Sequence, residues 1–249
     1  MAAAKRLQKI VDLLAKRYEA EGKKGELTEL RDPFLLGAWY VLGQHSKRNG
    51  QGRAYEALRR AKGLTPGQLL DILPEKLHTI CQIAGPYEDA RGRELYAYAD
   101  AIEEKCGQDF SKIFKKSIPE ARKFLEGDLK MSRAFADFLF MYTGTPIFAV
   151  DTRIARVATR LGMGKMKNEK MIDDKSYPVV QKALEAEGPK DADFMIRAHG
   201  LLHRHGADVC HAVKPNCETC PLVKECAYVK KHPIVPRDPA APTYYSRRG

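Results

Sequence analysis

The sequence predicts an all-α protein, and three observations lead to that prediction. Apolar residues recur at helical spacing through most of the 249 residues. Turns that contain glycine, proline or asparagine separate these segments, as at Asn49-Gly50, Gly85-Pro86 and Gly188-Pro189. No alternating apolar and polar run of any length occurs, so no β-strand is predicted.

The helices are predicted in chain order from their apolar faces and their end signals. The first is amphipathic, and its apolar face carries Leu7, Ile10, Val11 and Leu14. The second follows Asp32-Pro33, where aspartate suits the N-cap and proline suits the first turn. It is apolar almost all round from Phe34 to Leu42, which predicts a central core helix. Further helices are predicted over residues 51–62, 66–71, 74–82, 90–106, 109–115, 118–125, 132–141, 152–161, 176–187 and 190–204.

The chain is basic, with 43 Lys and Arg residues against 32 Asp and Glu residues, a formal charge of +11. Such an excess fits a nucleic-acid partner, although solvated lysines alone make many proteins basic. The longest apolar runs fall short of the roughly 20 residues that span a membrane. The start has no apolar segment before a cleavage site. We therefore expect a cytoplasmic protein, nucleoid-associated if prokaryotic, with no membrane partner.

Four of the six cysteines fall in one short stretch, at Cys210, Cys217, Cys220 and Cys226. Zinc sites usually use two tight Cys or His pairs, whereas this stretch has one tight pair between two wider arms. The spacing therefore favours an iron–sulfur cluster over zinc or unrelated free thiols, which remain alternatives. Cys81 and Cys106 lie in predicted helices and are interpreted as buried small apolar residues.

Two further segments have to be considered together. Residues 125–139 predict a helix, a tight turn and a second helix. Residues 143–154 then predict a short extended piece that brings Asp151 to the N-terminus of the next helix.

This arrangement resembles the endonuclease III branch of the helix-hairpin-helix DNA glycosylases over about residues 28–228. The matching runs are PIFAVDTRIARV at 146–157, GPYEDARGREL at 85–95, and HGLLHRHGADVC at 199–210, which leads into the four cysteines. The resemblance implies two helical domains. One is a six-helix barrel over 34–147, with the helix-hairpin-helix near 120–141. The other is an iron–sulfur cluster domain built from 1–33 and 148–230, whose cysteines hold a 4Fe–4S cluster. Residues 231–249 are predicted to be a basic, flexible tail.

The resemblance also implies a base-excision-repair enzyme, a DNA glycosylase whose catalytic residue is Asp151. Breaking the bond between base and sugar builds positive charge on the sugar, which a fixed carboxylate stabilises. The same carboxylate can orient or deprotonate the attacking group. An aspartate before a helix is by itself most often an ordinary N-cap. The expected partner is double-stranded DNA with a damaged or mismatched base, and a monomer is expected.

Two departures from the family pattern affect the expected chemistry. The hairpin turn of the family is usually Leu-Pro-Gly-x-Gly, and the stretch from Leu129 to Ser132 has no glycine. Bifunctional members carry a lysine after the hairpin that forms a Schiff base, and here that position is Arg133 or Ala134. Neither side chain can serve as the amine nucleophile, so a monofunctional enzyme is predicted, with Lys130 as the alternative amine. The predicted DNA-contacting residues are Gln44, His45, Lys130, Met131, Ser132, Arg133 and Arg153.

Three residue sets carry lesser predictions. Tyr40 stands where the mismatch-specific adenine glycosylases have a glutamate, so adenine excision of their type is not expected. Tyr40 faces a base pocket or, as the commoner alternative, belongs to the core. The arginines at helical spacing, Arg153, Arg156 and Arg160, predict a basic stripe. The three histidines His199, His203 and His205 are interpreted as packing at a helix end near the cluster.

Two other functions remain open from sequence. One is a catalytically weak or inactive DNA-binding protein that retains the fold and the cluster, which the missing lysine and the altered hairpin support. The other is a redox-sensing cluster protein whose DNA affinity depends on the oxidation state of the cluster.

Overall fold

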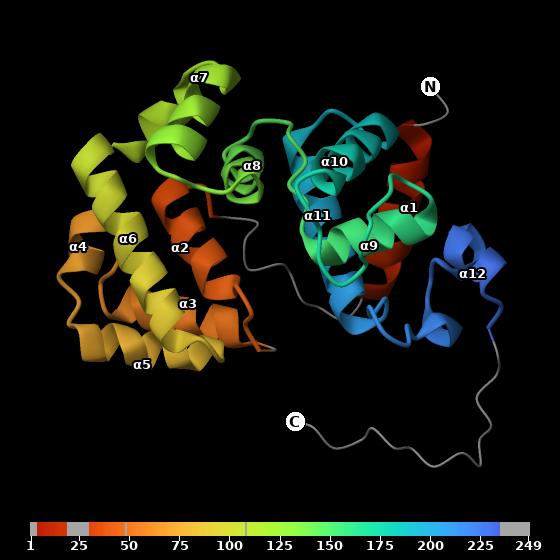
Figure 1. Ribbon diagram of the computed structural model, residues 1–249, viewed down its shortest axis with the longest axis horizontal. Coiled ribbons are helices and arrows are strands. Elements are labelled where there is room, and N and C mark those ends of the chain that lie inside the picture. The colour runs from red at the N-terminus through yellow and green to blue at the C-terminus, as the bar shows by residue number, and fades with distance from the viewer. Residues whose placement is uncertain (1–3, 19–29, 48, 108, 235–249) are drawn as a thin grey trace, which may run out of the picture. The chain divides into compact units, whose positions relative to one another are not determined.

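The computed structural model describes residues 4–18, 30–47, 49–107 and 109–234 (Figure 1). Within these ranges every regular element is a helix, which confirms the predicted all-α class. None of the helices there is long and apolar enough to cross a membrane. Most of the predicted basic tail, residues 235–249, lies outside the described residues. The chain divides into two compact units, and each is described by itself.

The first unit, here the α2 unit, contains the described residues 30–150 and 188–200. Its α-helices are α2 (Pro33–Gly43), α3 (Gly50–Arg60), α4 (Pro66–Leu70), α5 (Pro74–Ala84), α6 (Glu88–Cys106), α7 (Ile118–Arg122) and α8 (Arg133–Tyr142). A 3₁₀ turn, η1 (Phe110–Lys115), precedes α7, and a π-helical turn, η2 (Lys123–Asp128), follows it. The segment predicted as helix 109–115 is thus a 3₁₀ turn, and the helix predicted over 118–125 changes to π geometry after Arg122.

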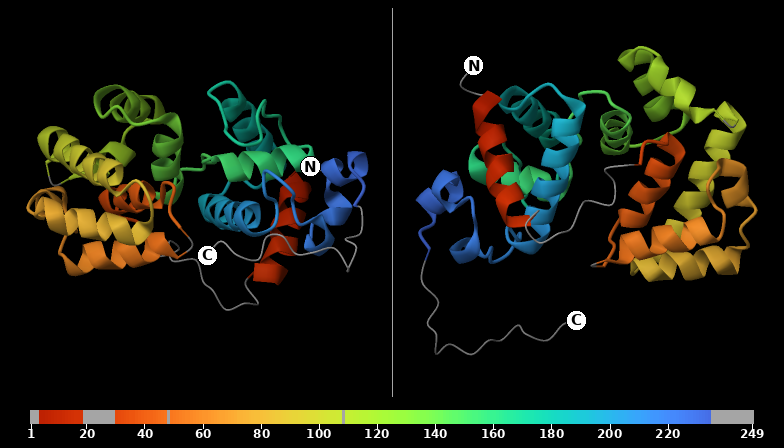
Figure 2. Two further views of the ribbon diagram at one scale, coloured as in Figure 1. Left: turned by 60° about the horizontal axis from the view of Figure 1, so that its bottom comes forward. Right: turned by 180° about the vertical axis from the view of Figure 1, so that it is seen from behind.

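Helix α2 is the core element of its unit, as its all-round apolar sequence predicts. It packs against α3, α5, α6 and α8 (Figure 2). Its start has the expected form, since Asp32 accepts a hydrogen bond from the Leu35 N–H at 2.8 Å. Gly37 is required by packing, because a Cβ there would lie 2.1 Å from the hydroxyl of Tyr98 on α6. That hydroxyl lies within hydrogen-bond distance of the carbonyls of Pro33 and Phe34.

The second unit, here the α9 unit, contains the described residues 4–18, 151–187 and 201–234. Its helices are α1 (Ala4–Tyr18), α9 (Thr152–Leu161), α10 (Ser176–Glu187), the part of α11 (Ala192–Asp208) from Leu201 on, and α12 (Ala227–Lys231). The short 3₁₀ turns η3 (Cys217–Thr219) and η4 (Val223–Glu225) lie between the cysteines. Helix α10 packs against α1 and α9, and α12 packs against α9.

The unit boundaries differ from the predicted domain boundaries at three places. Residues 30–33, 148–150 and 188–200 belong to the α2 unit, whereas the sequence placed 1–33 and 148–230 in the cluster domain. The largest of these differences is at 188–200. Side-chain contacts explain the difference. Arg31 pairs with Asp193 at 3.2 Å, and His199 packs edge-on against the rings of Phe138 and Tyr142. The N-terminal part of α11 is therefore attached to the α2 unit by contacts that helical periodicity does not reveal.

Candidate functional site

Asp151 lies where a buried extended segment meets the start of α9. It is the N-cap of this helix, and its Oδ1 accepts a hydrogen bond from the Ile154 N–H at 2.7 Å. The dipole of α9 favours negative charge at this end. The side chain is 37% exposed, so the carboxylate is fixed at one oxygen and still open to solvent.

The second oxygen of Asp151 is also hydrogen-bonded. Oδ2 contacts Nδ1 of His203 on α11. The other ring nitrogen of His203, Nε2, lies 2.7 Å from Nη1 of Arg153 on α9. The three side chains therefore form a short chain of hydrogen bonds at one end of α9. Sequence analysis assigned His203 to packing near the cluster, and this interpretation is wrong, because its ring contacts Asp151.

His205, two residues after His203 on α11, has the structural role that sequence analysis expected of it. Its ring is 1% exposed and lies between the Tyr18 hydroxyl at 3.0 Å and the Cys220 Sγ at 3.4 Å. Burial, first of all, lowers the pKa of His205 to about 4, so the ring is neutral near physiological pH. His205 links α1 to the cysteine loop.

The arginines of α9 do not form the predicted basic stripe. Arg156 and Arg160 are 6% and 4% exposed, and both contact the segment around Cys210. Arg156 donates to the carbonyls of Cys210 and Gly206, and Arg160 donates to the carboxylate of Glu169. A helix of this kind can bury two guanidinium groups only because carbonyls and a carboxylate accept their N–H donors. Only Arg153 of the three is partly exposed.

None of the four cysteines of the 210–226 stretch forms a disulfide bond. Burial, the largest cause, and charge on Cys210, Cys226 and Cys217 together raise the pKa of Cys220 to about 11. The thiols therefore lie close enough to interact electrostatically. Arg160 Nη1 lies 3.3 Å from the Cys210 Sγ, which places a positive group beside one of them.

The donor set of these cysteines determines which metal group they could hold. Among the described residues, no three His, Cys, Asp or Glu side chains are placed to bind one metal ion. A 4Fe–4S cubane does not need several side chains at one metal ion, because each of its four irons takes a single thiolate. Four mutually interacting thiols beside a buried guanidinium suit an anionic cluster of that kind. Of the two remaining cysteines, Cys81 is buried as predicted and Cys106 is only half-buried.

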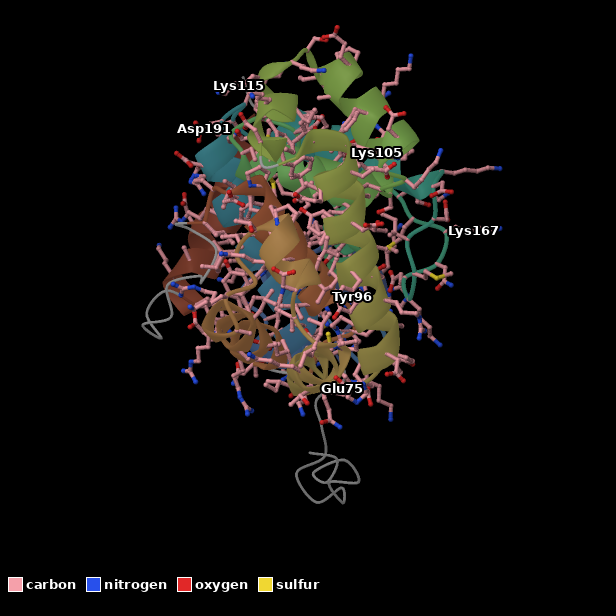
Figure 3. The ribbon with its side chains drawn as sticks, turned by 90° about the vertical axis from the view of Figure 1, so that its left-hand side faces the viewer. Glu75, Tyr96, Lys105, Lys115, Lys167 and Asp191 are labelled. Atoms are coloured by element: carbon pink, nitrogen blue, oxygen red, sulfur yellow. The ribbon has the colours of Figure 1, made fainter. Side chains whose placement is uncertain are left out.

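The predicted hairpin is present, but its geometry differs from a glycine turn. The π-helical turn η2 ends at Asp128, and the Lys105 ammonium at the end of α6 donates to the Asp128 carbonyl at 2.7 Å (Figure 3 labels Lys105). Lys130 adopts a φ of +55°, the left-handed region where glycine is usual. Ser132 then caps α8 by accepting a hydrogen bond from the Phe135 N–H at 3.3 Å.

The residues of the hairpin turn differ in what they present to solvent. Lys130, Ser132 and Arg133 are exposed. Met131 is 9% exposed, and its N–H donates to the Leu125 carbonyl at 3.0 Å. Met131 was predicted to contact DNA, but the structure assigns it to the packing of the hairpin, because both its side chain and its N–H are used inside the protein.

Arg133, at the first position of α8, belongs to a charged group around a buried aspartate. Asp137 has a fully buried side chain and accepts a hydrogen bond from Arg122. Arg133 Nε lies 3.8 Å from the same carboxylate. Burial lowers the pKa of Arg122, but its hydrogen bonds to Glu126 and Asp137 outweigh this effect, and the pKa lies above its ordinary value. The guanidinium of Arg133 is thus attracted to a carboxylate one turn along its own helix.

Tyr40, the tentative base-pocket residue, lies at the end of an aromatic row. Its ring stacks on Phe135 at 4.4 Å with an interplanar angle of 11° and contacts Phe138 at 5.1 Å. Phe135 and Phe138 are buried, whereas Tyr40 is partly exposed. One face of Tyr40 therefore packs on the core of the α2 unit and part of the side chain remains accessible, while its place at a base pocket stays a prediction.

Gln44 and His45 follow α2 directly. Gln44 Nε2 donates to Glu94 at 2.8 Å, and His45 is exposed with a φ of +51°. The exposed ring of Tyr87, also at positive φ, packs edge-on against His45 at 5.4 Å. Sequence analysis did not single out Tyr87, although it lies in the quoted GPYEDARGREL run. An aromatic residue directly after a Gly-Pro turn is the signal that could have identified it.

Arg91 holds these two loops together. It is 3% exposed, and its guanidinium donates to the carbonyls of Gln44, Gly85 and Pro86. The loop after α2 and the loop before α6 are therefore joined at one buried cation. Their exposed tips, His45 and Tyr87, are presented as a pair.

The structure thus divides the predicted site residues between the two units. Asp151, Arg153 and the four cysteines belong to the α9 unit, together with His203. The α2 unit contains the aromatic, loop and hairpin residues Tyr40, Gln44, His45, Lys130, Met131, Ser132 and Arg133.

The chain is similar in sequence to bacterial proteins named endonuclease III. It is 30% identical over 165 residues to the protein of Rickettsia prowazekii, an alignment that spans 66% of this chain and 69% of that one. It is 32% identical over 85 residues to the protein of Rickettsia conorii, which covers 34% of this chain and only 36% of that one. The match with the Rickettsia conorii protein is thus confined to about a third of its length. No family model matches the chain.

The fold is similar to that of a solved endonuclease III. A structure titled as a trapped endonuclease III–DNA covalent intermediate superimposes with a TM-score of 0.65 at 24% identity. The superposition covers 93% of this chain and 99% of that chain. The arrangement of helices is therefore shared over nearly the whole of both chains.

Proposed function

The chain belongs to the endonuclease III family, and on this premise we propose that it is a DNA base-excision-repair glycosylase. It flips a damaged or mismatched base out of double-stranded DNA and hydrolyses its N-glycosidic bond. The observation that carries the proposal is the carboxylate of Asp151, which is held at the N-terminus of α9 and remains 37% exposed.

Asp151 acts on the sugar. As the base departs, positive charge builds on the sugar ring, and a carboxylate fixed beside it stabilises that charge more than it stabilises the neutral substrate. The same carboxylate accepts the proton of the water that attacks the sugar carbon. Hydrogen bonds to both of its oxygens hold it in place, so little reorganisation is needed during the reaction.

The enzyme is proposed to be monofunctional. Arg133 stands where the family resemblance places the Schiff-base lysine, and a guanidinium remains protonated and does not attack the sugar. Its proximity to the buried Asp137 supports a structural role instead, and its exposure leaves the guanidinium able to contact a phosphate. Lys130 is the nearest amine on the hairpin and is exposed.

DNA contact is proposed for the exposed residues of the hairpin and of the two linked loops. Lys130 and Arg133 supply positive charge near the N-terminus of α8, where helix N–H groups also favour a phosphate. His45 and Tyr87 present two rings that can stack where the flipped base leaves a gap. Gln44 supplies a polar side chain beside them, Arg153 supplies a further cation, and Tyr40 is proposed to border the base pocket.

A 4Fe–4S cluster is proposed as the cofactor, held by Cys210, Cys217, Cys220 and Cys226. Its contribution is structural, since it ties the C-terminal segment of the α9 unit together. Arg160 supports this role, because it joins α9 to the Cys210 thiol and stacks on Tyr228 of α12 at 4.7 Å.

The Cys217→Ser variant tests whether the four cysteines hold a 4Fe–4S cluster. We expect the purified wild-type protein to contain iron and inorganic sulfide in equal amounts and to absorb visible light. Cys217→Ser should lose most of the iron and sulfide and most of the visible absorbance. The thermal unfolding midpoint of Cys217→Ser should fall, since metal binding and folding are coupled. Cys106→Ser, a half-buried cysteine outside the loop, serves as the control and should retain the cluster. Zinc in place of iron, or no metal at all, would contradict the proposal.

A single-turnover assay on a panel of labelled duplexes tests the function. The panel contains uracil, thymine opposite guanine, oxidised pyrimidines, 8-oxoguanine, hypoxanthine and alkylated bases, and each reaction is split with and without alkali. We expect strand cleavage at one class of base, and only after alkali. Strand cleavage without alkali, together with a protein–DNA Schiff base that borohydride traps, would contradict the proposal that the enzyme is monofunctional. Loss of that trapping in Lys130→Met would then identify the amine.

The same panel distinguishes the alternative function. Tight binding to duplex DNA with no excision of any base would favour a DNA-binding protein that retains the fold and the cluster. The missing Schiff-base lysine and the altered hairpin, whose turn has no glycine and places Lys130 at a positive φ, are the features that favour this alternative.

A further inference from the structure

The packing of α11 against α9 brings His203 into hydrogen-bond contact with the proposed catalytic carboxylate of Asp151. Helix α11 lies close to α9 at Gly206, where an added Cβ would lie 2.7 Å from the Cβ of Arg153 and 3.1 Å from its carbonyl oxygen. His203 is one turn before Gly206 on α11. The close approach therefore brings the imidazole of His203 against the first turn of α9, which carries Asp151 and Arg153.

The contacts of the ring determine where its proton lies. An arginine N–H can only donate, so Nε2 of His203, at 2.7 Å from Arg153 Nη1, has to be the acceptor. A neutral imidazole with an unprotonated Nε2 carries its hydrogen on Nδ1. Nδ1 is the atom that contacts Asp151 Oδ2, so His203 donates to the carboxylate.

The charged groups around this ring agree with that assignment. Asp151 and Arg153 contact the ring from α9, and Arg156, one turn further along α9, interacts electrostatically with Asp151. With Arg153 on one side and the carboxylate on the other, the neutral Nδ1–H form satisfies both neighbours. A protonated ring would set its second N–H against the Arg153 donor.

We propose that His203 is a positioning residue for base excision, which fixes the orientation and the negative charge of Asp151 by donating its Nδ1–H to Oδ2. The Ile154 N–H holds Oδ1 in the way of any N-cap, so this bond alone leaves the carboxylate free to rotate and to accept a proton on Oδ2. The His203 bond fixes the rotation and favours the charged carboxylate before the reaction, and the second lone pair of Oδ2 remains available for the proton of the attacking water. This inference rests on the proposed function, because it assigns Asp151 the catalytic role.

Two substitutions distinguish the effect of losing the hydrogen-bond donor from the effect of losing the imidazole ring. The amide nitrogen of asparagine can take the place of Nδ1, so His203→Asn retains a donor to Asp151, whereas His203→Leu removes it. A hydrogen bond to a charged group supports an expected loss of about ten- to a hundredfold in single-turnover excision rate for His203→Leu. His203→Asn should stay within a few-fold of wild type. DNA affinity and the unfolding midpoint should be nearly the same in all three proteins.

The pH profile distinguishes positioning from a general structural effect. Donation from His203 favours the charged carboxylate, so its loss should move the acidic limb of the rate profile to higher pH by about one unit. The limb of His203→Asn should coincide with that of wild type. His78→Leu is the matched control, because it removes a histidine that pairs with Asp89 at 2.9 Å on the α2 unit, and it should change neither rate nor profile.

Five results would overturn the proposal. Equal rates for His203→Leu and His203→Asn, or a rate loss with an unmoved acidic limb, would leave His203 without a positioning role. Nitrogen NMR of the wild-type imidazoles gives a test that needs no variant, since it should report the Nδ1–H form of His203, and an Nε2–H form would contradict the geometry. A wild-type protein that excises no base would overturn the proposed function and this role together, whereas an active wild type with an unaffected His203→Leu would overturn this role alone.

Discussion

Asp151→Asn is expected to lower the single-turnover excision rate at least about a hundredfold while leaving DNA affinity unchanged. Asparagine is as good an N-cap as aspartate, so its side-chain oxygen can still accept the Ile154 N–H and α9 should still form. What the variant loses is the negative charge that stabilises the sugar cation and the oxygen that accepts the proton of water. The measurement is the rate on the duplex that the wild-type protein cleaves, with affinity determined by titration.

The matched control for this variant is Asp191→Asn. Asp191 precedes α11, and its Oδ1 accepts a hydrogen bond from the Phe194 N–H at 2.7 Å, the same geometry as at Asp151 (Figure 3 labels Asp191). Its replacement should leave the rate within twofold of wild type. Comparable rate losses in the two variants would point to helix capping, and an active Asp151→Asn would remove Asp151 from the mechanism.

Arg122→Met is expected to destabilise the protein by about 3 kcal/mol, because it leaves the buried carboxylate of Asp137 without its main partner. The lower end of the usual range is expected, since Arg133 lies 3.8 Å away and compensates in part. Arg122→Met combined with Asp137→Leu should recover most of the loss, because no charge then remains buried. Chemical denaturation of the single and double variants measures both effects.

An exposed ion pair in the same unit provides the control for that measurement. Arg59 and Glu56 pair at 2.9 Å with more than half of each side chain exposed. Arg59→Met should cost less than about 1 kcal/mol. If Arg122→Met costs no more than Arg59→Met, the buried pair does not stabilise the α2 unit, and the position of Arg133 must depend on something else.

Much of the helical framework could be predicted because helix ends are local chemistry. The segments predicted over 152–161 and 176–187 are α9 and α10 with those bounds. Asp32 and Pro33 start α2 as their residue types predict. A side chain that caps a helix bonds a backbone group three residues away, so no distant partner is needed to recognise it.

The hairpin shows where local signals were insufficient. Its turn has no glycine, and the left-handed conformation falls on Lys130. The π-helical turn before it ends with the Leu129 N–H donating to Phe124 and the Met131 N–H donating to Leu125. These bonds depend on how the turn packs against α6 and α8, so the burial of Met131 was not predicted from the sequence.

The sequence by itself determined that the protein is all-α, that four cysteines are grouped near its end, and that Asp151 begins a helix after an extended segment. Each of these follows from residue type and spacing along the chain. The tertiary structure decided that Arg156 and Arg160 are buried, that residues 188–200 join the α2 unit, and that His203 contacts Asp151. Periodicity gives the face on which a side chain lies, but its partner depends on which helix packs there, and the approach of α11 to α9 at Gly206 sets the partner of Asp151.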